Sequence, residues 1–295
     1  MCTRNRKCVT VGILSLLAFL AGPCAAGPIV YSISAGTQLG VADLGTGAFT
    51  PIGSPLPYPV SGIGHGTDGT LYAMDAANNL IRIDTSTGAV TTIGSSNIPL
   101  LPSQAFPAVG FAATGSGGLY GVSYDNVLYR FDQGTGAGTE IGSTGIPVLD
   151  YSSLLDGTAE FLKGMAGLGN DIYFSSHTFR FDGNGVPTDI TSDALYRLNL
   201  ITGAATKVGD LDPFTWLLGG ISGVLYGEQI QLGPAGPSLA LFTIDPNTAA
   251  AQVLVTRLPM DHMLDGAASV PEPAALLLLG TGLLVLALVH PRHSR

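Results

Sequence analysis

Residues 80–93 read LIRIDTSTGAVTTI, which places two short apolar strands on either side of a polar turn. The turn has the form Asp-x-x-Thr-Gly and runs from Asp84 to Gly88. An aspartate carboxylate can accept a hydrogen bond from a backbone N–H two residues further on, and glycine adopts positive φ without strain. The stretch therefore predicts a β-hairpin, with one strand that starts at Leu80 and one that returns toward Ile93.

The same hairpin recurs along the chain, each time after a strand in which an apolar residue is followed by tyrosine. The tyrosines and the Asp or Asn residues of their turns are Tyr31 with Asp43, Tyr72 with Asp84, Tyr120 with Asp132, Tyr173 with Asn199, and Tyr226 with Asp245. An apolar residue follows each Asp or Asn by nine positions, at Ile52, Ile93, Ile141, Val208 and Leu254. The interval from Tyr to Asp or Asn is 12 in the first three units, 26 in the fourth and 19 in the fifth, so the last two carry insertions.

A glycine-centred segment precedes the tyrosine strand and predicts a fourth strand, because small residues suit a strand crowded around a central axis. The central glycines are Gly62, Gly110, Gly164, Gly220 and Gly266, spaced 48, 54, 56 and 46 residues apart. Four-stranded units of this length are typical of propeller blades. The first unit lacks this strand, and residues 264–268 match it at the other end of the chain. We therefore predict an all-β, five-bladed β-propeller over residues 27–270, whose first blade is closed by the C-terminal strand.

A six-bladed ring is the alternative, in which the insertion after Tyr173 forms a blade of its own. The repeat resembles those of secreted propeller proteins with an L-Y…D-x-x-T-G signature, a resemblance that covers most of the predicted domain and implies no particular activity.

The N-terminus has the three parts of a signal peptide. Arg4, Arg6 and Lys7 are followed by the apolar residues 9–20 and by small residues before Gly27. The prediction is a signal peptide over residues 1–26. Since the cysteines are Cys2, Cys8 and Cys24, the exported chain would contain none. A lipoprotein signal with Cys24 as the lipidated residue is the alternative, and Pro23 argues against it.

The C-terminus consists of Val-Pro-Glu-Pro at residues 270–273, an apolar run at 274–289 and a cluster with basic residues at 290–295. The apolar run predicts a transmembrane segment, about 24 Å long as a helix, and the basic cluster suits the cytoplasmic side. An ordinary C-terminal membrane anchor would explain these features without any sorting.

This order of parts resembles the PEP-CTERM sorting signal, here at residues 271–295. The resemblance implies recognition of Pro271, Glu272 and Pro273 by an exosortase-like transpeptidase. It also implies an inner-membrane anchor before processing, and then a location at the cell surface or in the extracellular matrix of a Gram-negative, polysaccharide-producing bacterium. His290, Pro291 and His293 interrupt the basic cluster, which departs from the usual arginine-dense form.

Strand order predicts that the long and variable loops of the propeller lie on one face, where function tends to concentrate. These loops carry the aromatic residues Tyr58, Phe106, Tyr151, Phe161, Phe214 and Trp216. Such rings could stack on sugars, with Trp216 as the first candidate because indole is large and also a hydrogen-bond donor. The alternative is structural: the rings plug the channel mouth or pack over neighbouring blades.

The fourth-unit insertion contains Asp182, Asn184 and Asp189, and oxygen-rich loops with glycine turns can hold Ca²⁺. A plain polar turn is the alternative, since the spacing matches no established calcium loop. No other cofactor is expected. Residues 27–270 contain 7 Lys and Arg against 20 Asp and Glu, which excludes a basic surface for nucleic acid.

Two functions follow from these features. The first is an exported, non-catalytic envelope or matrix protein that binds exopolysaccharide or another envelope component through the long-loop face. The alternative is a glycan lyase or hydrolase with its site at the channel mouth. The predicted domain contains the histidines His65, His177 and His262, which are not paired in sequence, so we expect no enzyme.

Overall fold

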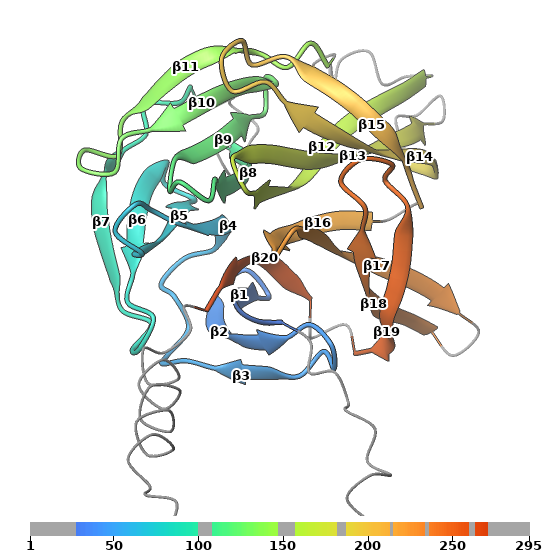
Figure 1. The fold of residues 1–295 in the computed structure, drawn as a ribbon, viewed down its shortest axis with the longest axis horizontal. Helices are drawn as coiled ribbons and strands as arrows, with labels where there is room; N and C mark the ends of the chain where they lie inside the picture. The colour runs from blue at the N-terminus through green and yellow to red at the C-terminus, as the bar shows by residue number, and fades with distance from the viewer. Residues whose placement is uncertain are drawn as a thin grey trace, which may run out of the picture.

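The computed structural model describes residues 28–99, 108–146, 157–181, 187–212, 215–233, 236–259 and 263–270. All regular secondary structure within these ranges is β-strand, and the strands form five antiparallel sheets of four strands each. The sheets are arranged as a ring around a central axis (Figure 1). The five-bladed β-propeller is therefore confirmed. The predicted signal peptide and transmembrane segment lie outside the described residues.

The blades are numbered here in chain order, from the inner to the outer strand. Blade 1 consists of β20 (Leu264–Ser269), β1 (Ile29–Ser34), β2 (Gln38–Asp43) and β3 (Phe49–Pro51). Blade 2 consists of β4 (Val60–His65), β5 (Leu71–Asp75), β6 (Asn79–Ile83) and β7 (Val90–Ser95). Blade 3 consists of β8 (Ala108–Ala113), β9 (Leu119–Ser123), β10 (Val127–Phe131) and β11 (Gly138–Ser143).

The last two blades have longer strands. Blade 4 consists of β12 (Gly157–Leu168), β13 (Asp171–Phe181), β14 (Pro187–Leu198) and β15 (Ala205–Leu211). Blade 5 consists of β16 (Thr215–Ile221), β17 (Val224–Gly233), β18 (Gly236–Ile244) and β19 (Ala251–Leu258).

The C-terminal strand closes the ring, as predicted. Strand β20 pairs with β1 in antiparallel register, with Val30 opposite Ser269 and Ser32 opposite Ala267. Figure 1 shows these strands, from opposite ends of the chain, side by side in one blade. The ring is thus complete within residues 28–270, and the edge of β1 that would otherwise be open is paired with β20.

The insertion in the fourth unit lengthens a hairpin and adds no blade. Strands β13 and β14 have 11 and 12 residues, and their pairing continues past His177 and Asp193 to Phe181 opposite Pro187. The fifth-unit insertion lengthens β17 and β18 in the same way. The six-bladed alternative is therefore wrong.

The repeated turns have the geometry that their residues predict. The Oδ1 atom of Asp84 accepts the backbone N–H groups of Ser86 and Thr87, both at 2.9 Å, and Gly88 has a φ of 73°. In the fourth unit Asn199 takes the same role, with its Oδ1 2.9 Å from the backbone nitrogen of Ile201. An amide oxygen is therefore sufficient to hold this turn.

The apolar residue nine positions after Asp or Asn forms a β-bulge in four outer strands. Ile93 lies between Thr92 and Gly94, which pair with the consecutive residues Ile81 and Leu80. Ile141, Val208 and Leu254 occupy the same place in their blades. A bulge bends and twists a strand, so this repeated residue marks where each of these outer strands curves.

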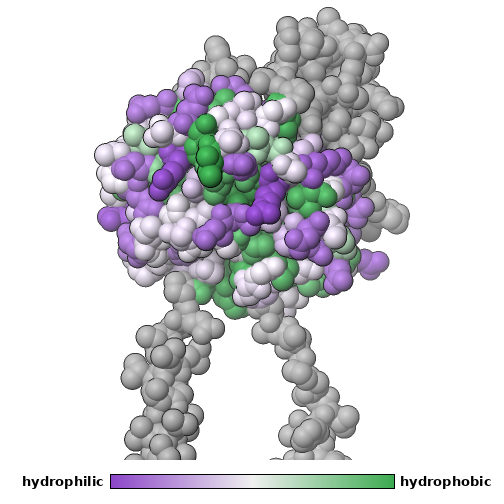
Figure 2. All heavy atoms as spheres, turned by 45° about the horizontal axis from the view of Figure 1, so that its top comes forward, coloured by the Kyte–Doolittle hydropathy of each residue, from purple (hydrophilic) through white to green (hydrophobic). Residues whose placement is uncertain are grey.

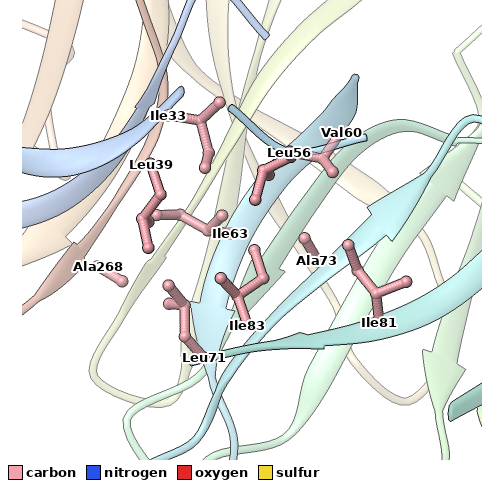
Figure 3. Packing of buried hydrophobic residues seen from close by; sticks show 10 residues of the cluster. All are labelled: Ile33, Leu39, Leu56, Val60, Ile63, Leu71, Ala73, Ile81, Ile83 and Ala268. Atoms are coloured by element: carbon pink, nitrogen blue, oxygen red, sulfur yellow. The ribbon is translucent and has the colours of Figure 1, made fainter. Parts of the chain in front are cut away.

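Hydrophobic clusters fill the spaces between neighbouring blades. Between blades 1 and 2, the fully buried side chains of Ile33 and Leu39 lie against Ile63, Leu71 and their neighbours, as Figure 3 shows. Burying a leucine or isoleucine contributes about 1.5–3 kcal/mol relative to leaving it exposed. Four further clusters repeat the arrangement around the ring, and these contacts hold the blades together.

Candidate functional site at the channel mouth

The two faces of the ring differ in their connections. Because neighbouring strands are antiparallel, inner-to-second and third-to-outer turns lie on one face, which we call the short-turn face. The second-to-third links and the links between blades lie on the other, the long-loop face. Inner strands run from the long-loop face to the short-turn face, for example from Val60 to His65 in β4.

The central channel contains two cavities that meet at Met165. One, of about 240 Å³, lies at the long-loop end and is lined by Val60, Trp216 and Leu264 among others. The other, of about 170 Å³, lies at the short-turn end beside His65. Met165 lines both and is buried. A Cβ atom at Gly110 would lie 2.5 Å from Cγ of Met165, so the glycine leaves room for this side chain on the channel.

Trp216 is half-buried at the mouth of the long-loop cavity. It lies on β16, the inner strand of blade 5, and its ring meets the His177 ring edge-on, with centroids 5.9 Å apart and planes at 86°. His177 comes from β13 of blade 4. The indole is therefore packed across the boundary between the two blades.

A buried histidine–aspartate pair lies next to the indole. Nδ1 of His177 is 2.5 Å from Oδ2 of Asp193, and the two side chains are only 2% and 0% exposed. The same Oδ2 accepts the backbone N–H of Thr215 at 2.8 Å. Asp193 thus holds both the imidazole against which Trp216 packs and the backbone immediately before Trp216.

Two further polar side chains fix the inner strands around the mouth. Oγ of Ser175 accepts the backbone N–H of Leu217 at 3.2 Å, and Oε2 of Glu228 accepts that of Leu264 at 3.1 Å. Ser175 and Glu228 are both buried, and each bonds across a boundary between blades. Neither Asp193 nor Glu228 was predicted from the sequence as part of a site. The sequence feature that could have indicated them is an acidic residue in the middle of a segment that is otherwise typical of a β-strand.

The structure moves two predicted loop aromatics onto strands. Trp216 lies on β16 and Phe161 on β12, where the backbone of Phe161 pairs with that of His177. Both were predicted in loops, and they belong to strands because the inner strands of blades 4 and 5 start earlier than the glycine pattern indicates. Tyr58 lies in the link between blades 1 and 2 and is half-buried. Phe106, Tyr151 and Phe214 lie outside the described residues.

The predicted calcium ligands are not brought into one described group. Asp182 and Asn184 lie outside the described residues, and the backbone of Asp189 lies on β14 opposite Arg180. Within the described ranges, no group of three His, Cys, Asp or Glu residues is placed to hold a metal ion.

The described histidines His65 and His177 belong to opposite ends of the channel. Nδ1 of His65 lies 2.9 Å from the carbonyl oxygen of Gly69, and its Nε2 lies 2.8 Å from that of Ser269. His65 therefore joins blade 2 to the end of β20 on the short-turn face. His262 lies outside the described residues.

The surface of the ring is mostly polar. Figure 2 shows hydrophilic residues across the visible face, with hydrophobic residues in small patches between them. Among the described side chains, the large hydrophobic residues that are exposed are Ile29, Ile201, Val253 and Leu254. None of these lines the long-loop cavity.

The family model of the PEP-CTERM protein-sorting motif matches residues 269–292. The sorting signal predicted from Pro271, Glu272 and Pro273 is therefore confirmed as a motif. It implies an exosortase-sorted extracellular protein that is anchored at the membrane before processing, and the folded part of this protein is a five-bladed propeller. No helix in the described part of the chain is long and apolar enough to cross a membrane.

Solved structures resemble this chain only at low similarity. TolB from Acinetobacter baumannii has 15% identity and a TM-score of 0.41, over 83% of this chain and 56% of that one. A protein of unknown function from Bacteroides caccae has 10% identity and a TM-score of 0.44, over 84% of this chain and 100% of that one. The extracellular domain of the hybrid two component system BT4673 from B. thetaiotaomicron has 14% identity and a TM-score of 0.38, over 77% of this chain and 26% of that one.

This chain spans only about a quarter of the BT4673 domain, 26% of its length, and about half of TolB. No curated protein matches the sequence. Similarities of this size say nothing about function.

Proposed function

We propose that the propeller is a non-catalytic envelope or matrix protein that binds exopolysaccharide through the long-loop face. The observation that carries this proposal is the position of Trp216, whose ring lines the cavity at the channel mouth while His177 packs against its side. An aromatic ring held in a fixed orientation is a suitable surface for the apolar face of a sugar. Sorting by an exosortase-like system would bring the protein to the cell surface, where such a polymer is found.

The same cavity offers a polar group next to the ring. Oγ of Ser61 lines it and has no hydrogen-bond partner among the described residues. A buried hydroxyl without a partner is costly, and a ligand hydroxyl would satisfy it. A ring and a hydroxyl together form a small site, which suits one or two sugar units of a long chain. Binding to the polymer would then gain from many weak sites in parallel.

The test is binding of residues 27–270, a part that closes its own ring, to a glycan array and to host exopolysaccharide. Binding is measured with calcium and with a chelator, for the wild-type protein and for Trp216→Ala. Ile201→Ala is the matched control, because Ile201 is 88% exposed in a turn on the opposite face. We expect binding that Trp216→Ala abolishes and Ile201→Ala leaves intact. No binding under either condition would refute the proposal.

The buried His177–Asp193 pair favours one competing function, a glycan lyase or hydrolase, because a carboxylate can orient an imidazole as a general base. The pair would have to become accessible, since His177 is 2% exposed and does not line the cavity. Incubation with the bound glycan, followed by chromatography of the products, separates the two functions. Chain cleavage that His177→Asn abolishes would establish the enzyme.

A further inference from the structure

The two ends of the propeller meet at one point of the short-turn face. In blades 2 to 5 a turn joins the inner strand to the second strand on this face, as residues 66–70 join β4 to β5. In blade 1 the corresponding strands are β20 and β1, which come from opposite ends of the domain. The chain therefore enters before Ile29 and leaves after Ser269 at the place where the fifth turn would be.

The direction of β20 determines which face the sorting tail leaves. Leu264 lines the cavity at the long-loop end, whereas Ser269 lines the cavity at the short-turn end. His65 holds this exit point, since its Nε2 lies 2.8 Å from the carbonyl oxygen of Ser269. The match to the sorting motif begins at this same residue, at 269.

The tether between the ring and the apolar segment is short. Four residues, 270–273, separate Ser269 from the start of the apolar run, and two of them are proline. Five Cα steps span at most about 18 Å when extended. A domain of this length has a diameter of about 45 Å. The tether leaves the innermost strand of its blade and cannot reach around the rim to the other face.

We propose that the short-turn face is the surface that the anchored protein holds against the lipid bilayer before the tail is processed, so that the long-loop face points away from the membrane. This orientation does not depend on which ligand the long-loop face binds.

Attraction to lipid headgroups does not explain this orientation. The turns of the short-turn face contain no lysine or arginine, and aspartates occupy or border them: Asp43, Asp68, Asp84, Asp132, Asp171 and Asp245. Arg82, Arg130 and Arg197 lie nearby on the third strands, and Lys207 lies nearby on β15. Such a surface does not adhere to anionic lipid. The tether alone therefore keeps this face near the bilayer, and the face separates from it once the tail is removed.

The experiment uses residues 27–295, the cysteine-free chain that remains once the predicted signal peptide is removed, in vesicles of phosphatidylethanolamine and phosphatidylglycerol. A donor dye is attached at Ser86→Cys, in a turn of the short-turn face, or at Ala77→Cys, in a link of the long-loop face. Both positions are in blade 2, separated by strand β6, which is about 17 Å long at 3.3 Å per residue. Energy transfer to an acceptor on the lipid headgroups reports which position lies nearer to the bilayer.

We expect transfer from position 86 to exceed that from position 77 at least about twofold. Dipolar energy transfer falls with a high power of distance, and β6 separates the two positions by about 17 Å. Equal transfer, or stronger transfer from position 77, would overturn the proposal. Equal unfolding temperatures of the two labelled proteins show that both are folded.

A second variant tests the tether itself. A flexible Gly-Ser insertion of about 30 residues after Val270 extends the average reach of the tether to about 30 Å. The insertion should remove most of the difference in energy transfer between positions 86 and 77. A difference that persists would mean that the face binds lipid directly, which would refute the tether as its cause.

Discussion

Nε2 of His65 lies 2.8 Å from the carbonyl oxygen of Ser269, which joins the second blade to the strand that completes the first. Nδ1 of the same ring lies 2.9 Å from the carbonyl oxygen of Gly69, and the ring meets that of Tyr31 edge-on with centroids 6.0 Å apart. This histidine therefore ties the last residue of the C-terminal strand to two other segments. It stabilises ring closure at the point where the sorting tail leaves.

We expect His65→Ala to lower the free energy of unfolding by about 1–2 kcal/mol, because it removes a hydrogen-bond donor and a ring contact. In this variant β20 should be destabilised more than the rest of the ring, so hydrogen exchange should speed up at the amides of Ala267 and Ala268 more than at those of β9. His65→Gln keeps one hydrogen-bond donor, so its free energy of unfolding should lie between those of the wild-type protein and His65→Ala. Unchanged exchange in β20 would show that His65 does not support closure.

The turn glycines combine a backbone requirement with close approach to the neighbouring blade. Gly136 has a φ of 80°, and a Cβ atom there would lie 2.4 Å from the carbonyl oxygen of Gly94 in blade 2. Gly145 has a similar φ of 76°, but nothing lies within 4 Å of its Cβ position. A comparison of alanine substitutions at these two positions therefore distinguishes the cost of backbone strain from the cost of steric overlap.

Gly145→Ala should destabilise the protein by about 1 kcal/mol through the left-handed backbone alone. Gly136→Ala should cost roughly 3 kcal/mol, since the overlap adds to the same strain. Urea unfolding measures both values. Equal losses at the two positions would mean that the contact between blades contributes nothing.

Acid stability should depend on the aspartates of the repeated turns. Hydrogen bonds from the side chains of Ser86 and Thr87, and then from their backbone N–H groups, lower the pKa of Asp84 from 3.8 to about 2. A pKa that is lower in the folded state gives stability that is present above the unfolded value and lost as the pH falls through the folded value. The loss from Asp84 should therefore occur between about pH 4 and pH 2. The same kinds of hydrogen bond lower the pKa of Asp132 and of Asp245.

Asp84→Asn should fold normally at pH 7, because Asn199 already holds the equivalent turn through its Oδ1. Its stability should decline less between pH 4 and pH 2, since the amide does not titrate. Urea unfolding over pH 2–7 tests this. A decline as steep as that of the wild-type protein would mean that other groups cause the loss of stability at low pH.

The buried pair behind Trp216 should be sensitive to loss of one partner. Asp193→Ala leaves His177 buried without its carboxylate and should cost about 3–5 kcal/mol. The double variant His177→Phe with Asp193→Leu should be less destabilised than Asp193→Ala, because it removes both polar partners together. Equilibrium unfolding of the three proteins tests this. Tryptophan fluorescence should change in every variant that loses His177, since this ring packs against the single tryptophan.

Much of the architecture follows from local physics and could therefore be predicted. A tyrosine strand, an Asp-x-x-Thr-Gly turn and a return strand each rest on side-chain alternation and turn chemistry, which act over a few residues. Five copies of the pattern predicted five blades. The glycine strand missing from the first copy, and present near Gly266, predicted the closure that β20 provides.

The candidate site could be predicted only in part, because its contacts join residues from different blades. Trp216 was a candidate because of its chemistry and its predicted place in a long loop, whereas the structure places it on a strand. His177 and Asp193 lie opposite each other only because the insertion between them folds as a continued hairpin. Their spacing of 16 residues shows nothing of this, since an insertion of that length could equally form a loop or another blade.

The sequence alone determined the four-stranded repeat, the closing strand, the turn chemistry and the sorting motif, since each depends on neighbouring residues or on a repeated interval. Only the tertiary structure decided which residues meet between blades: Gly94 with Thr135, Trp216 with His177, and His65 with Ser269. These contacts depend on how far each blade is rotated against the next, which is set by the packing of all five hydrophobic clusters together.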